Sequence, residues 1–262
     1  MWRCCSVVDL KDVTQLDNVV YIIRTESSKI SRFDATTHRR LPDMVIEDFS
    51  ESCDGPRYIA ACQCTSRLYV ADLKYVWRVS SGQSGGTCIQ RWLPKSSSAS
   101  FSSFISALSV TASRLLVTFT DHLRQFDVRG VELRHVNVYG ITHAVESPTG
   151  LLIVSTIQYN KGKNHHLVRK VNTAGQVINC SPALDSIPHM AVDSKGNVLV
   201  AYPECQILLI GPELRQWHAI VDENQLNYEQ PQRLCYIEQS GQLLVGLKNR
   251  GSVAVFNVCT DK

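Results

Sequence analysis

The chain has 262 residues, of which 44% are hydrophobic and 19% are charged, which provides enough apolar material for a sizeable core and excludes a disordered chain. The formal net charge of +3, from 27 basic and 24 acidic residues, excludes a strong field that would attract nucleic acid or membrane non-specifically. No apolar run reaches the roughly 18 to 20 residues of a membrane span, so we expect a soluble protein.

The N-terminal sequence and the cysteines indicate the cellular compartment in which the protein is expected. Asp9 interrupts the N-terminal stretch before the apolar core of a signal peptide could form, which predicts a cytoplasmic protein. The ten cysteines are scattered singly or as Cys4-Cys5 and Cys62-Gln63-Cys64, without the density of a small disulfide scaffold. We therefore expect mainly reduced thiols.

Short β-prone segments recur along the whole chain in units of about 40 to 50 residues, a period typical of propeller blades. A β-prone stretch, Trp2–Val8, precedes the first unit. In chain order the predicted strands are Val19–Ile23, Lys29–Asp34 and Arg40–Ile46; Tyr58–Ala61, Leu68–Ala71, Tyr75–Ser80 and Cys88–Leu93; Ile105–Val110, Leu115–Phe119, His122–Asp127 and Glu132–Val138; Thr142–Val145, Leu151–Ser155, His166–Val171 and Gln176–Cys180; His189–Val192, Asn197–Ala201, Gln206–Ile210 and Trp217–Val221; and Arg233–Ile237, Gln242–Gly246 and Ser252–Asn257.

This pattern predicts an all-β protein folded as one six-bladed β-propeller over residues 1–262. No window of a dozen residues has a sustained period near 3.6, so we expect at most single helical turns. The last unit lacks an outer strand after Asn257. We expect Trp2–Val8 to supply that strand, because closing the ring removes the exposed edges of an all-β architecture.

Two segments carry a resemblance to a known repeat. His189–Ala201, which reads HMAVDSKGNVLVA, and Ser66–Asp72, which reads SRLYVAD, resemble the NHL repeat. Arg91–Ser98, His143–Gly150 and Gln225–Tyr228 are similar to the propeller ends of invertebrate tripartite-motif-like proteins. The resemblance implies a recognition module that binds protein or RNA on one propeller face. Tyr202-Pro203-Glu204 departs from the repeat, which has an Asp after the position of Ala201.

The residue at the start of each innermost strand is expected at the mouth of the central channel. Aligning the units gives Tyr58, Ser106, His143, His189 and Arg233. Convergent polar groups on a rigid scaffold suit a ligand site, although such residues also serve only to fill a channel. His143 and His189 lie in adjacent units and could share a metal, but the sequence offers no evident third ligand. We therefore predict no metal and no cofactor.

The densest basic cluster lies in and beside the predicted insertion Gln158–Asn164 in the fourth unit. It consists of Lys161, Lys163, His165, His166, Arg169 and Lys170. With Tyr58, Tyr159 and Trp77 as stacking aromatics it could bind single-stranded RNA, whereas a solvated basic loop is the simpler interpretation.

These observations favour a monomeric, non-enzymatic recognition domain whose partner is a protein segment, with RNA as the second candidate. The alternative from a different class is a metal-dependent propeller hydrolase or lyase with its site at the channel mouth.

Overall fold

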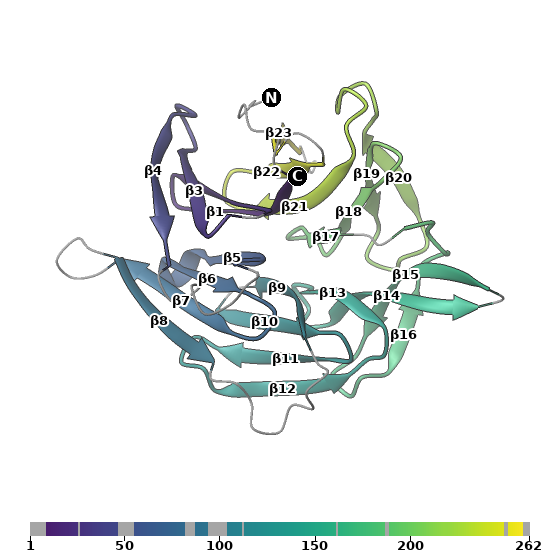
Figure 1. Cartoon of the computed structure of the whole chain (residues 1–262). Coiled ribbons are helices and arrows are strands. Elements are labelled where there is room, and N and C mark those ends of the chain that lie inside the picture. The colour runs from purple at the N-terminus through teal and green to yellow at the C-terminus, as the bar shows by residue number, and fades with distance from the viewer. Residues whose placement is uncertain are drawn as a thin grey trace.

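In a computed structural model of the chain, the residues described are 9–25, 27–46, 55–81, 87–93, 104–111, 113–160, 162–186, 189–248 and 251–258. They form six small antiparallel sheets arranged in a ring, so the predicted all-β, six-bladed propeller is confirmed (Figure 1). Within these residues the one helical segment is a single 3-10 turn, η2 (Gln63–Thr65). No helix in this part of the chain is long and apolar enough to cross a membrane.

The first three blades each have four strands that pair in chain order. The first blade contains β1 (Leu10–Leu16), β2 (Val19–Arg24), β3 (Lys29–Asp34) and β4 (Arg40–Val45). The second contains β5 (Tyr58–Cys62), β6 (Arg67–Ala71), β7 (Val76–Ser81) and β8 (Thr87–Leu93). The third contains β9 (Ile105–Thr111), β10 (Arg114–Phe119), β11 (His122–Asp127) and β12 (Glu132–Asn137).

The next two blades repeat this order, and the last one has three strands within the described residues. The fourth blade contains β13 (Ile141–Glu146), β14 (Leu152–Asn160), β15 (Lys163–Val171) and β16 (Val177–Cys180). The fifth contains β17 (His189–Val192), β18 (Val198–Tyr202), β19 (Gln206–Ile210) and β20 (Trp217–Val221). The sixth contains β21 (Pro231–Ile237), β22 (Gln242–Leu247) and β23 (Val253–Asn257).

The core is divided into six hydrophobic clusters, one between each pair of neighbouring blades. Successive side chains of a strand point to opposite faces of its sheet, and both faces are covered by a neighbouring blade. In β10, for example, Leu115 and Val117 pack against the second blade, whereas Leu116 packs against the fourth. This explains why the second strand of each blade is a nearly continuous apolar run.

The ring is closed by packing between the first and last blades. Leu10 and Val13 of β1 share a buried cluster with Leu244 and Val253 of the sixth blade. The strand β1 is the innermost strand of the first blade, and the sequence analysis missed it. The expected pairing of Trp2–Val8 with the last strand lies outside the described residues.

In the fourth, fifth and sixth blades a tight turn containing Gly150, Gly196 or Gly241 joins the innermost strand to the second strand. In the fifth blade, Asp193 Oδ1 accepts hydrogen bonds from the backbone N–H groups of Lys195 (3.0 Å) and Asn197 (2.8 Å). Gly196 has a φ of +84° in this turn, a conformation that L side chains rarely adopt. The segment His189–Ala201 therefore forms a β-hairpin held by its own aspartate.

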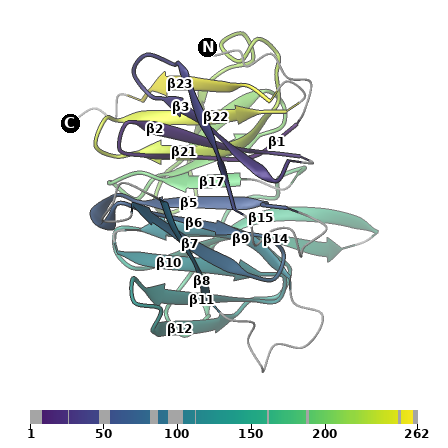
Figure 2. The same ribbon diagram turned by 60° about the vertical axis from the view of Figure 1, so that its left-hand side comes forward.

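The segment Gln158–Asn164 was expected to be a loop, and this expectation is wrong. The strands β14 and β15 continue through it, with Gln158 paired to His165 and Asn160 paired to Lys163. Figures 1 and 2 show this hairpin projecting beyond the other blades. Two neighbouring polar segments can extend a β-ladder because backbone pairing needs no apolar side chains.

Candidate functional site

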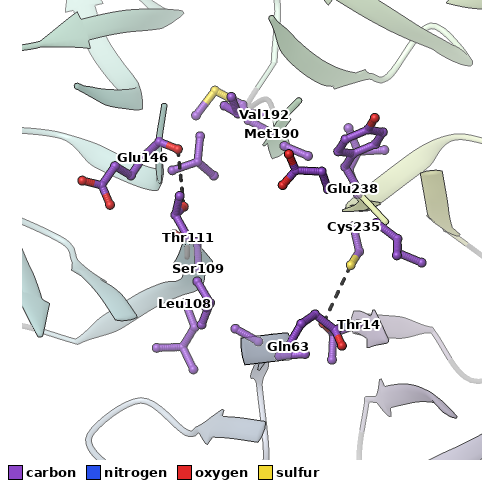
Figure 3. Close-up of a pocket in the computed structure, with 18 of the residues that line it drawn as sticks. Thr14, Gln63, Leu108, Ser109, Thr111, Glu146, Met190, Val192, Cys235 and Glu238 are labelled. Atoms are coloured by element: carbon purple, nitrogen blue, oxygen red, sulfur yellow. Dashed lines mark hydrogen bonds between the residues drawn. The ribbon is translucent and has the colours of Figure 1, made fainter. Parts of the chain in front are cut away.

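The innermost strands of all six blades surround a central cavity of about 600 Å³. Figure 3 shows its walls, where apolar side chains such as Leu108 and Val192 alternate with polar ones such as Thr14 and Ser109. Pockets for small ligands typically have volumes of about 300 to 1,000 Å³. The cavity is therefore large enough for a small ligand or for one or two side chains of a partner.

The two ends of the cavity differ in exposure. Asp12 and His143, at the start of their innermost strands, are only 5% and 4% exposed. Cys64, Ser194 and Glu238, at the opposite ends of the innermost strands, line the same cavity and are exposed. The cavity is thus open where the innermost strands turn back, whereas the sequence analysis expected the mouth at their starts.

A layer of polar side chains, here called the channel floor, closes the buried end. Its members are Asp12, Tyr58, His143, His189 and Arg233, which pair in register with Ile23, Ala71, Ser155, Ala201 and Gly246 on the second strands. The structure thus brings together all the predicted channel residues except Ser106. A β-bulge stands one residue before the channel-floor position in β1, β13 and β21 as well as in β9, so the equivalent residue in β9 is Ala107, opposite Thr118. Ser106 is the bulged residue, and it donates to the Thr118 carbonyl at 3.3 Å.

Asp12 is the channel-floor residue that sequence reasoning missed. Its Oδ1 accepts a hydrogen bond from the Val13 N–H and its Oδ2 accepts one from the Ile59 N–H, each at 2.9 Å. Burial raises the pKa of Asp12 to about 6, although the nearby charge of Arg233 and the two backbone hydrogen bonds oppose this shift. Asp12 therefore links the first blade to the second.

His143 and His189 stack against each other, with their ring centroids 4.1 Å apart and their planes inclined by 30°. Burial lowers the pKa of His143 to about 3, with a further contribution from the charge of Arg233. Burial, His143 and Arg233 also lower the pKa of His189 well below its usual value. Both imidazoles are consequently neutral at pH 7.

The two imidazoles have different hydrogen bonds. His189 Nδ1 accepts from the Leu234 N–H at 3.1 Å, which places the proton of the neutral ring on Nε2. His143 Nδ1 is buried and has no hydrogen-bond partner in the described part of the chain. A buried nitrogen without a partner is energetically costly, and here it belongs to a residue that lines the cavity. His143 is therefore a channel-floor residue whose hydrogen-bonding capacity is incompletely used.

Arg233 connects the channel-floor residues of neighbouring blades. Its Nε donates to the Lys11 carbonyl at 2.6 Å and lies 3.9 Å from Asp12 Oδ1. With the Leu234 N–H bonded to His189, these contacts connect the fifth, sixth and first blades. Asp12, His189 and Arg233 thus have a structural role in the ring.

The open end of the cavity carries three acidic residues with different surroundings. Glu146 is buried, and its carboxylate is held by Arg114 (2.9 Å) and by Gln125 (2.7 Å). The Asp193 carboxylate is occupied by its own turn. Glu238 is exposed, and its carboxylate points into the channel (Figure 3). Glu238 is therefore the acidic group best placed to meet a cation entering the channel.

The geometry does not assemble a metal site from the predicted histidines. Nitrogen lone pairs lie in the plane of an imidazole ring, so the lone pairs of two stacked rings do not converge on one point. Within the described residues, no three His, Cys, Asp or Glu side chains are grouped as metal ligands would be.

The predicted basic cluster is distributed over both faces of the projecting hairpin. Residues alternate in β15, so His166 and Lys170 lie on one face while His165 and Arg169 lie on the other. His166 is buried and its pKa is lowered, first by burial and then by His165. Lys161 lies outside the described residues.

Two of the basic side chains have partners within the protein. Lys170 Nζ donates to Glu213 Oε1 and to the Pro212 carbonyl, each at 3.1 Å. Arg169 donates to Gln158 Oε1 at 3.1 Å. The cluster therefore presents less free positive charge on one surface than its sequence suggests.

Comparison with known proteins supports the propeller architecture. No known protein family and no curated protein sequence matches the chain. Among solved structures, a Bacteroides caccae protein of unknown function is similar with a TM-score of 0.64 at 14% identity, covering 87% of this chain and 81% of that one. Hydrazine synthase of Kuenenia stuttgartiensis is similar with a TM-score of 0.63 at 11% identity, covering 96% of both chains. At these identities the similarity shows a shared six-bladed β-propeller fold.

Proposed function

We propose that this protein is a non-enzymatic recognition domain whose central channel receives a segment of a partner protein. The observation that carries the proposal is the open cavity of about 600 Å³, whose walls combine apolar and polar side chains, on a rigid ring. The ligand in this proposal is still a protein segment, as the sequence predicts, but it enters the channel from the opposite end. The partner would enter where the innermost strands turn back, because the channel floor blocks the other end.

The charges of the channel define the chemistry of the segment. Glu238 points into the cavity (Figure 3), and Arg114, the one Lys or Arg among the described residues that line it, is paired with Glu146. A Lys or Arg side chain would meet the Glu238 carboxylate, and its aliphatic part would contact the apolar walls. The NHL-type character of the repeats is part of this proposal and rests on the two motif segments that resemble that repeat.

The test is selection from a random peptide library on the immobilised full chain, followed by calorimetry with the selected peptides. We expect enriched peptides to share a basic residue, and Glu238→Lys to weaken their binding by at least about tenfold, equivalent to about 1.4 kcal/mol. Glu204→Lys is the matched control. Glu204 is an exposed carboxylate in the β18–β19 turn, at the other end of its blade, and this variant should bind within about twofold of wild type.

Two outcomes would overturn the proposal. The first is that the library yields no common sequence. The second is that the selected peptides bind Glu238→Lys as tightly as they bind the wild type. Elemental analysis of the purified protein addresses the rival class, because one zinc or calcium ion per chain would favour a metal-dependent hydrolase or lyase.

A further inference from the structure

Cys62 and Cys64 form a close pair of thiols at the open end of the channel. Cys62 ends β5 and is buried, with 1% of its surface exposed. Cys64 lies in the η2 turn, is exposed, and lines the cavity. Their sulfur atoms are 3.3 Å apart. The pair thus combines one accessible thiol with one protected thiol in direct contact.

The backbone that carries the pair is held in place from both sides. Gln63, between the two cysteines, donates from Nε2 to the Gln15 carbonyl at 2.7 Å and accepts from the Asp17 N–H at 3.2 Å. After the turn, Ser66 has a φ of +46° and its N–H donates to the Gln63 carbonyl at 3.3 Å. The turn is therefore anchored to the first blade while the sulfur atoms face each other.

The two sulfur atoms are already in contact. A disulfide has a sulfur–sulfur distance of about 2.05 Å, so the two atoms need to approach by about 1.2 Å. The residues belong to one turn, so bond formation closes no long loop. Holding two reacting groups in contact makes their reaction intramolecular, which raises its rate over that of separate molecules.

We propose that Cys62 and Cys64 are a redox modification site that a small-molecule disulfide such as oxidised glutathione converts into an intramolecular disulfide. The Cys64 thiolate attacks one glutathione sulfur, which forms a mixed disulfide and releases one glutathione thiolate. The Cys62 thiolate then attacks Cys64 Sγ and displaces the second glutathione. Two protein thiols are oxidised, and their two protons pass to the two departing glutathione thiolates, so that one glutathione disulfide is reduced to two thiols.

The pair also has a defined pH dependence. Burial and the neighbouring Cys62 raise the pKa of Cys64, so its thiolate is scarce at neutral pH. The first step should accelerate about tenfold per pH unit from pH 7 to pH 8, in proportion to the thiolate fraction. Oxidation would alter the wall of the cavity at Cys64, independently of which ligand the channel binds.

The experiment is treatment of the folded full chain with oxidised glutathione at pH 8, followed by non-reducing peptide mapping and mass spectrometry. In the wild type, the peptide containing both residues should lose the mass of two hydrogens and keep no glutathione. In Cys62→Ser, glutathione should stay on Cys64, because the resolving thiol is gone. In Cys64→Ser, Cys62 should stay unmodified, because it is buried.

Cys180 provides an internal control in every sample. It is exposed, and its Sγ donates to the Ser181 carbonyl rather than contacting a second thiol. Without a neighbouring thiol among the described residues to displace the glutathione, Cys180 should keep it as a mixed disulfide. The inference is overturned if wild-type Cys64 keeps glutathione, joins another cysteine, or stays unmodified while Cys180 reacts. The wild-type result alone decides this, so the test does not depend on the folding of either variant.

Discussion

His143 shows how a single buried residue controls the stability of the channel floor. Its pKa is about 3 in the folded protein and about 6.5 when unfolded, so only the unfolded chain takes up the proton between these values. A group with a depressed folded pKa loses its stabilising contribution as the pH falls. Asp12 acts in the opposite direction, because its raised pKa lets the folded protein take up a proton below about pH 6.

We predict that His143→Phe removes part of the acid sensitivity. From pH 7 to pH 5, the free energy of unfolding of the wild type should fall by about 2 kcal/mol more than that of the variant. Asp12 titrates in both proteins, so its contribution cancels in the comparison. Guanidinium unfolding at the two pH values measures the difference, and an equal loss in wild type and variant would contradict the proposed cause.

At the scale of the element, the sequence predicted most strands because a strand covered by blades on both faces is a short, nearly continuous apolar run. The strand β1 escaped because Asp12 and Thr14 are polar yet buried. Their partners are the Ile59 N–H and the sulfur of Cys235, which belong to other blades and cannot be seen locally. Ser106 stands one position too early, because the bulge that precedes Asp12, His143 and Arg233 also precedes Ala107 and has no residue signature.

The contact between β1 and β22 provides a test of the packing that closes the ring. A Cβ added at Gly246 would lie 2.6 Å from Leu10 Cδ2 and 3.2 Å from Arg233 Cβ, and Leu10 is completely buried. We expect Gly246→Ala to lower the free energy of unfolding by about 1 to 3 kcal/mol, because a close-packed core has no room for the methyl group.

Gly211→Ala is the matched control for this substitution. The nearest atom to a Cβ at Gly211 is the Gln216 carbonyl oxygen at 3.8 Å, an ordinary contact. Its unfolding free energy should stay within about 0.5 kcal/mol of the wild type. Equal effects of the two substitutions in denaturant unfolding would show that the contact between the first and last blades is not tightly packed.

At the scale of the whole molecule, the ring of blades is closed between the first and last blades. One part of this closure is a side-chain contact in the structure, and the other is a strand predicted from the sequence. The buried cluster formed by Leu10, Val13, Leu244 and Val253 joins the first and last blades. Within the described residues, β23 is the outermost strand of a three-stranded sheet, whereas the other blades have four strands. The sequence prediction that Trp2–Val8 supplies the fourth strand follows from the cost of leaving a sheet edge uncovered.

Deletion of residues 2–8 tests this prediction. If the segment pairs with β23, its removal exposes one sheet edge and eliminates several backbone hydrogen bonds, each of which contributes about 0.5 to 1.5 kcal/mol. In a protein of this size, 1 kcal/mol corresponds to about 2 to 4 °C in Tm, so we expect Tm to fall by at least about 4 °C. Removal of residues 259–262 trims the other terminus and should change Tm by less than about 1 °C. Calorimetry of the wild type and the two shortened proteins shows whether residues 2–8 pair with β23, because removal of an unpaired segment costs no stability. An unchanged Tm after deletion of residues 2–8 would mean that the first blade closes the ring through side-chain packing alone.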